Sequence, residues 1–184
     1  KDFDKQYRND IRLLSNDTSI NSANLDMLVL TRYLREQAGQ LDGYTGFTGR
    51  ISTFGSARTS SGSTIFTVQN SGPRTGGLIS AFGLNESSDL SKVLTIPDYG
   101  NIEFVNPLLI PKNQIPNWVK QVNGQIEDAA INVHAEGNLI GFTGAKNITT
   151  IAISHYSGMC QRCEDMMNQR FSSIAVYYST WKRR

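Results

Sequence analysis

The sequence predicts an α/β protein in which a central mixed sheet lies between two layers of helices. Segments with the spacing of amphipathic helices alternate with short β-branched and aromatic runs, in the order helix, hairpin, irregular region, helix, strand, helix, strand. The 184 residues, 39% hydrophobic and 18% charged, are typical of one globular domain with a sizeable core. No apolar run approaches the ~20 residues that cross a membrane. We expect a monomer without a membrane partner.

The first part of the chain consists of a polar segment followed by segments with regular apolar patterns. Residues 1–21 are polar and weakly patterned, which predicts a linker or N-terminal extension ahead of a domain at residues 22–184. Apolar residues at helical spacing predict a helix over residues 25–38, which the following glycine ends. Residues 50–57 and 64–69 have the composition of two strands joined by a Ser/Gly turn. They should form the first hairpin of the sheet.

The region after this hairpin carries mixed signals. We expect a loop at residues 71–77, a short helix within 85–94 and a strand at 102–109. Tyr99 and Trp118 are suited either to stacking on a base or to burial in the core. We favour burial for both aromatic side chains.

The last third of the chain predicts four elements: a helix within residues 123–144, a strand at 147–154, a helix that starts near Cys160 and a strand at 173–179. Both helices should begin at the same edge of the sheet, so that their N-termini meet. His155 follows the end of a strand, where α/β sheets place their ligands. It either contacts substrate or has a structural role.

One histidine and the only two cysteines of the chain form a candidate metal site. His134, Cys160 and Cys163 match the three protein ligands of a catalytic zinc, which keeps its fourth position for water. Cysteines at i and i+3 lie on one face of a helical turn, so one ion can contact both sulfurs. A redox pair, a structural zinc site and the absence of any metal are the alternatives. A structural Cys₂His₂ site would require His155 as a fourth ligand at an unusual spacing.

Glu136 lies two residues after the candidate ligand His134. A zinc ion makes a coordinated water acidic enough to act as a nucleophile near neutral pH. A carboxylate beside that water can take its proton and pass it to a leaving group. We therefore expect Glu136 to be catalytic without binding the metal.

The His-Ala-Glu motif at residues 134–136 and Cys-x-x-Cys at 160–163 resemble the zinc-dependent cytidine deaminase superfamily. The resemblance covers roughly residues 25–184, and only its last third is specific. Met159 stands where the family most often has proline, and bacterial toxin deaminases often lack that proline, which indicates this branch. The resemblance implies the three-layer α/β/α deaminase fold, a Zn²⁺ cofactor on the three ligands and Glu136 as proton shuttle. Ala135, between His134 and Glu136, is a further candidate for substrate contact.

Compared with a minimal deaminase pattern, residues 71–121 look like an insertion. An insertion at this point would cover the rim of the active site. We expect it to influence the choice of substrate.

The implied function is hydrolytic deamination of cytosine to uracil in DNA, by the toxin domain of a larger secreted protein. One alternative is a deaminase of free cytidine or of a base in RNA. Another is a non-catalytic binding module with a structural zinc. Such a module has no use for the Glu136 carboxylate, which argues against it.

The expected partners follow from charge and from this resemblance. A net charge of +2 and a pI of about 8.6 permit binding to single- or double-stranded DNA without requiring it. Asn70 is the candidate reader of the pyrimidine edge, and the basic tail at residues 181–184 either contacts phosphates or is solvated. A toxin implies a cognate immunity protein. It also implies delivery into a target-cell cytoplasm, a reducing compartment in which the thiols stay available for zinc.

Overall fold

The computed structural model describes residues 22–40, 53–70, 73–97, 99–129, 134–144, 147–155 and 160–179. The predictions for residues 1–21, for the tail at 181–184 and for the start of the strand at 50–57 lie outside these ranges. Within them, no helix is long and apolar enough to span a membrane.

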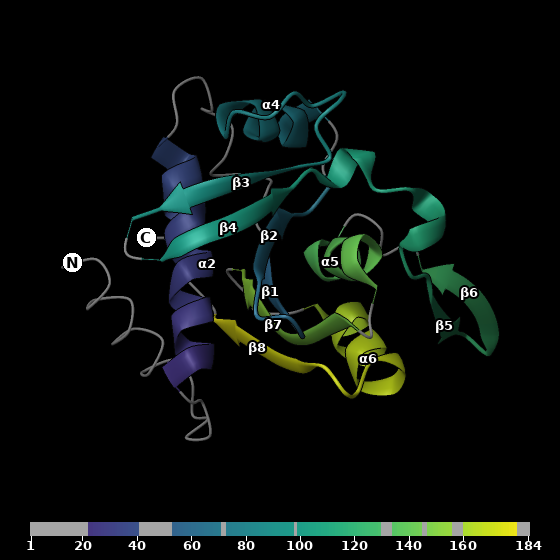
Figure 1. Cartoon of the computed structure of the whole chain (residues 1–184). Helices are drawn as coiled ribbons and strands as arrows, with labels where there is room; N and C mark the ends of the chain where they lie inside the picture. Colours follow the sequence, from purple (N-terminus) through teal and green to yellow (C-terminus); the bar gives the residue numbers. More distant parts are fainter. Residues whose placement is uncertain are drawn as a thin grey trace.

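A six-stranded mixed sheet forms the centre of the molecule, with strand order β3-β4-β2-β1-β7-β8 (Figure 1). β1 pairs antiparallel with β2 and β7, whereas β2 and β4 are parallel, as are β7 and β8. The predicted central mixed sheet is therefore confirmed. The strands are β1 Phe54–Thr59, β2 Thr64–Val68, β3 Ser91–Ile96, β4 Gly100–Val105, β7 Ile148–Ser154 and β8 Ala175–Ser179.

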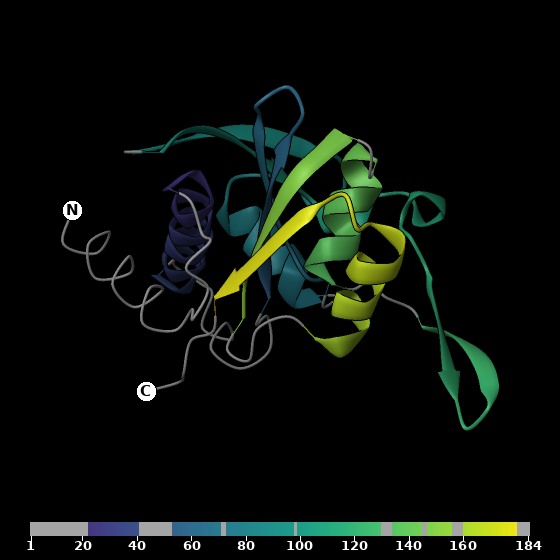
Figure 2. The ribbon, with the colours of Figure 1, turned by 90° about the horizontal axis from the view of Figure 1, so that it is seen from below.

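Helices cover both faces of the sheet, which confirms the three-layer α/β/α prediction. α2 (Ser22–Gln40) and α4 (Pro73–Ala81) pack on one face, around a cluster that includes Phe66 and Phe104. α5 (Ala135–Thr143) and α6 (Gln161–Arg170) pack on the opposite face. Figure 2 shows the strands between α2 on one side and α5 with α6 on the other.

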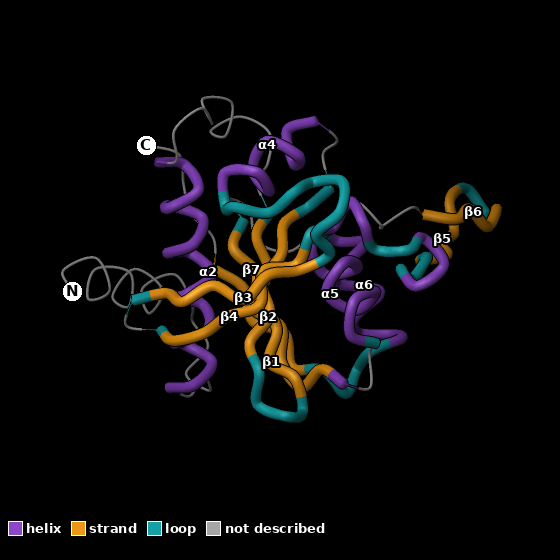
Figure 3. The backbone as a smooth tube through the Cα atoms, turned by 45° about the horizontal axis from the view of Figure 1, so that its top comes forward, coloured by secondary structure: helices purple, strands orange, loops and turns teal. Residues whose placement is uncertain are grey.

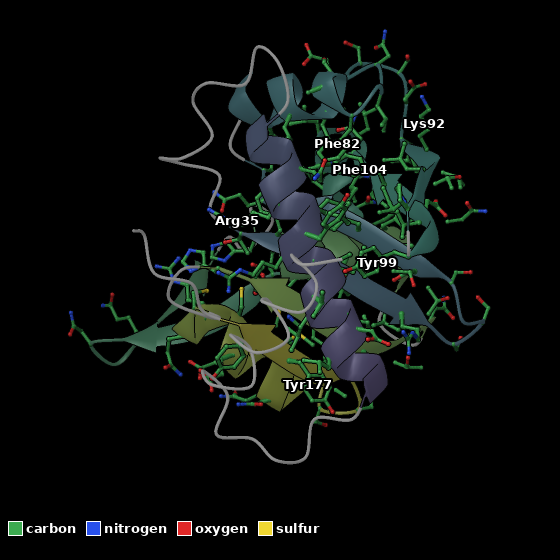
Figure 4. The ribbon with its side chains drawn as sticks, turned by 90° about the vertical axis from the view of Figure 1, so that its left-hand side faces the viewer. Arg35, Phe82, Lys92, Tyr99, Phe104 and Tyr177 are labelled. Carbon is green, nitrogen blue, oxygen red and sulfur yellow. The ribbon has the colours of Figure 1, made fainter. Side chains whose placement is uncertain are left out.

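Aromatic side chains fill the α2 face of the sheet. The rings of Phe82 and Phe104 stack with centroids 4.6 Å apart, and the Tyr99 ring lies 5.5 Å from that of Tyr33 on α2. Tyr99 and Tyr177 both pack against the cluster around the N-terminal half of α2, and Figure 4 shows them beside this helix. The predicted burial of Tyr99 is thus confirmed in part, because its side chain is half-buried.

α5 is enclosed on all sides, because every residue from Ala135 to Gly141 is buried. Glycines allow this close packing. A Cβ on Gly55 of β1 would lie 3.2 Å from the Ala135 Cβ and 3.1 Å from the Leu139 Cδ1. A Cβ on Gly141 would lie 2.9 Å from the Ile115 Cγ1 on the other side of the helix. The depth of α5 in the fold is therefore set by close contacts, at which a larger residue would fit only if its neighbours shifted.

The helix predicted within residues 123–144 occupies only the second half of that range, as α5. Before it, the chain forms a separate hairpin of β5 (Trp118–Val122) and β6 (Gln125–Ala129). Asn123 and Gly124 have φ angles of 51° and 79°, which suit a two-residue hairpin turn and break a helix. The hairpin projects away from the main sheet (Figure 3). Its base is held by the Arg170 guanidinium, which donates to the Asn117 carbonyl.

Three predictions after the first hairpin also need correction. The predicted loop at 71–77 contains the start of α4, because a proline fits the first position of a helix. The predicted helix at 85–94 is instead a turn followed by β3. In the turn the Ser87 N–H donates to Asn85 Oδ1 and the Asp89 N–H donates to the Asn85 carbonyl. The strand expected at 102–109 ends at Val105. A short 3₁₀ helix follows.

Part of the expected insertion is built into the main sheet. β3 and β4 pair with each other, and β4 pairs with β2. The segment after β4 continues into Ile110 and Ile115, which are buried in the same core cluster as α5. The region thus contacts the centre of the fold. Its status as an insertion and the domain limits at 22–184 stay predictions.

Candidate metal centre

The N-termini of α5 and α6 lie together at one edge of the sheet, as the sequence predicts. His134 is the N-cap of α5, and Cys160 is the N-cap of α6. The Cys160 sulfur accepts the Cys163 backbone N–H at 3.4 Å, so it replaces the oxygen of an ordinary capping residue. β7 delivers the chain to this edge, because it ends at Ser154, shortly before Cys160.

Three side chains from these two helix starts converge. The His134 Nδ1 lies 3.3 Å from the Cys160 Sγ and 3.2 Å from the Cys163 Sγ. All three atoms lie within 4.8 Å of one another, and this is the only such group among the residues that the structure describes. Cys160 is exposed whereas Cys163 is buried. The group could hold a metal ion that is reached from the Cys160 side.

The donor set fits a tetrahedral metal in chemistry and in size. One imidazole nitrogen and two thiol sulfurs are the ligands that zinc prefers. Zinc bond lengths of about 2.0 Å to nitrogen and 2.3 Å to sulfur set N–S separations of about 3.5 Å in a tetrahedron. The observed separations of 3.2 and 3.3 Å are shorter by only a few tenths of an ångström. Small side-chain movements would therefore accommodate the ion.

The two sulfurs differ in protonation. A hydrogen bond from the Cys163 thiol, with help from the nearby His134, lowers the pKa of Cys160 to about 4. The same bond, together with burial, raises the pKa of Cys163. The hydrogen bond with Cys160 also raises the pKa of His134. Without metal the cluster therefore favours a thiolate on Cys160 beside a protonated Cys163 thiol, and an arriving cation displaces the Cys163 proton.

Glu136 is buried next to this cluster, with only 1% of its surface exposed. Its Oε2 atom has no hydrogen-bond partner in the described part of the chain. Loss of solvent raises the pKa of the carboxyl group. A half-satisfied buried carboxylate is costly, so its position favours a chemical role over a structural one.

The other predicted site residues lie at the same edge of the sheet. Asn70 follows the end of β2, His155 follows the end of β7, and both are half-buried. The structure does not bring His155 into the metal group. The Ala135 side chain is fully buried against Gly55, so it contacts the core. Substrate contacts at these three residues stay predictions.

Asn138 is a site feature that the sequence reasoning missed. It lies one turn after His134 and is fully buried, and its Nδ2 donates to the Val68 carbonyl at 3.1 Å. The bond joins the helix of the candidate ligand to the end of β2. A second polar residue, after Glu136, in a helix that is otherwise apolar or glycine from Ala135 to Gly141 was the available signal.

Comparisons with protein-family models, curated proteins and solved structures find no match for this chain. The sequence motif, the His/Cys/Cys group and the α/β mixed sheet are compatible with a deaminase. The chemistry of the site is therefore what indicates a function for this protein.

Proposed function

We propose that this protein is a zinc-dependent hydrolytic deaminase that converts cytosine to uracil in DNA. One observation carries the proposal: the buried Glu136 carboxyl, whose Oε2 has no hydrogen-bond partner among the described residues, lies two residues from a candidate ligand in a His/Cys/Cys group. A structural zinc site has no use for such a carboxyl. A hydrolytic site needs a group that moves protons beside the metal.

The proposed reaction adds water at C4 of cytosine and breaks the bond from C4 to the exocyclic nitrogen, so that uracil and ammonia form. Zinc bound at the site would act as a Lewis acid and make water nucleophilic near neutral pH. Glu136 takes a proton from the attacking water and delivers it to the departing amino group. Its raised pKa suits this exchange, because a carboxyl that titrates closer to neutrality can both accept and release a proton.

The choice of DNA depends on the resemblance to bacterial toxin deaminases and on Met159 in the place of the common proline. A base in a polymer has to leave its stack before it enters such a site. We further propose that the chain is the toxin domain of a secreted protein. It would act in the reducing cytoplasm of a target cell, and an immunity protein would cover the metal centre.

The test is incubation of the zinc-loaded protein with single-stranded DNA, duplex DNA, RNA and cytidine, followed by chromatographic detection of uracil or uridine. We expect product from DNA. Glu136→Gln should abolish product formation while zinc remains bound. Glu103→Gln on β4 is the matched control, because it makes the same chemical change away from the metal group, and it should react at the wild-type rate.

The other outcomes separate the alternatives. Product only from cytidine or RNA would identify a different substrate for the same chemistry. Bound zinc without product on any substrate would favour a non-catalytic binding module. Residual activity of Glu136→Gln above background would remove Glu136 from the proposed role.

A further inference from the structure

Two polar side chains are buried in α5, and the proposed reaction uses only one of them. Glu136 and Asn138 are 1% and 0% exposed, in a helix whose other residues from Ala135 to Gly141 are apolar or glycine. Asn138 lies too deep to reach solvent. Its function therefore depends on the part of the chain to which its side chain is hydrogen-bonded.

Asn138 connects α5, the helix that follows the candidate ligand His134, to the C-terminal end of β2. Its Nδ2 donates to the carbonyl of Val68, the last residue of β2, which is 70 positions away in the chain. Gln69 and Asn70 follow directly, and they lead to the edge of the sheet at which His134 is placed. This hydrogen bond therefore links the segment with Asn70 to the helix with His134 and Glu136.

The same side chain is only half satisfied. Its Oδ1 has no hydrogen-bond partner in the described part of the chain. An unpaired buried acceptor is costly, and an apolar residue of the same size would avoid this cost. Stability alone is therefore a weak reason for asparagine at this position. What asparagine provides, and an apolar residue would not, is the hydrogen bond to the Val68 carbonyl.

We propose that Asn138 is a positioning residue. It fixes the distance between the start of α5, which carries His134 and Glu136, and the segment after β2, which carries the candidate substrate contact Asn70. This inference rests on the proposed function. Close packing of α5 at Gly55 and Gly141 sets how deep the helix lies. The bond from Asn138 to Val68 sets where the C-terminal end of β2 lies relative to the helix. Misplacement of reacting groups by roughly 1 Å can cost about 100-fold in rate, so this link should affect turnover.

The test compares Asn138→Leu with Thr67→Val. Thr67 is also fully buried, and its Oγ1 donates to the Val105 carbonyl at 2.8 Å. Each variant removes one buried hydrogen bond from a side chain to a backbone carbonyl, and each bond involves a residue near the end of β2: Thr67 donates to Val105 of β4, and Val68 accepts from Asn138. The Thr67 bond joins two strands, whereas the Asn138 bond joins a strand to α5.

Both zinc-loaded variants should melt at a similarly lowered temperature and keep their zinc. Asn138→Leu should lower kcat on the DNA substrate by at least tenfold, with a smaller effect on KM, whereas Thr67→Val should stay within about threefold of the wild type. Hydrogen exchange at the amides of Gln69 and Asn70 should accelerate in Asn138→Leu only. If Asn138→Leu does not fold, Asn138→Ser removes the same donor with a smaller side chain.

Equal kcat values for the two variants would overturn the inference. A loss of activity that matches a loss of zinc would also overturn it, because the role would then be structural. If the wild type forms no product on any substrate, the proposed function fails by itself. The exchange rates then decide: faster exchange at Gln69 and Asn70 in Asn138→Leu alone supports the inference, and equal rates in both variants overturn it.

Discussion

The Cys163 sulfur lies 3.2 Å from the His134 Nδ1, although 29 positions separate the two residues in the chain. This contact joins the starts of α5 and α6. It places a buried thiol and an imidazole where one cation can be bound by both.

Removal of this thiol should remove the metal. Cys163→Ala leaves two candidate ligands, so we expect zinc content to fall from about one per chain to nearly none, with a lower melting temperature because metal binding is coupled to folding. His155→Ala is the control, since His155 lies outside the metal group. The measurement is zinc by mass spectrometry after gel filtration. Unchanged zinc in Cys163→Ala would contradict the ligand assignment.

Burial of Glu136 should make the metal-free protein less stable as pH rises. Its folded-state pKa is raised by desolvation, so its contribution to stability is fully present below the unfolded pKa of about 4.3 and is lost as pH rises through the folded value. Glu136→Gln carries no charge at any pH. We therefore expect this variant to be more stable than the wild type near pH 8, with a difference that shrinks toward pH 5. Thermal unfolding in the presence of a chelator measures it, and a difference independent of pH would argue against the raised pKa.

Cys160 should be the reactive thiol of the metal-free protein. It is exposed, and the hydrogen bond from Cys163 lowers its pKa to about 4, whereas Cys163 is buried. Alkylation by iodoacetamide should modify Cys160 first, at a rate that is nearly constant between about pH 5.5 and 8. For an ordinary thiol with a pKa near 8.5, the alkylation rate falls about tenfold for each unit by which the pH is lowered over this range. Peptide mass spectrometry identifies the modified residue, and zinc should protect it. Faster labelling of Cys163 would contradict this prediction.

Gly55→Ala should disturb the metal centre from within the sheet. The new Cβ would lie 3.2 Å from the Ala135 Cβ, which moves only if α5 moves, and 3.0 Å from the Ile153 Cδ1. Overpacking of this kind costs roughly 1–3 kcal/mol. We expect lower stability in urea and weaker zinc binding. Adding Ile153→Val removes one of the contacting methyl groups and should restore part of both losses. Wild-type zinc affinity in Gly55→Ala would show that the contacts around Gly55 can admit a methyl group without moving α5.

The sequence by itself determined the fold class and the candidate donor set. Local patterns were sufficient for α2, β2 and β7, because the periodicity of their apolar residues reflects the face that they bury. The candidate ligands were evident from composition, since two cysteines at i and i+3 and a histidine offer few other combinations. The hairpin of β5 and β6 could also have been predicted from Asn123-Gly124, a dipeptide that favours the positive φ angles of a tight turn.

Only the tertiary structure decided how these parts meet. The burial of Glu136 and the bond from Asn138 to Val68 depend on residues far apart in the chain, and no local pattern records them. The placement of β4 next to β2 likewise depends on a parallel pairing across α4 and β3. Such long-range contacts arise because helices and strands have to bury their apolar faces against each other. The protonation of the thiols and of Glu136 then follows from the surroundings that this packing creates.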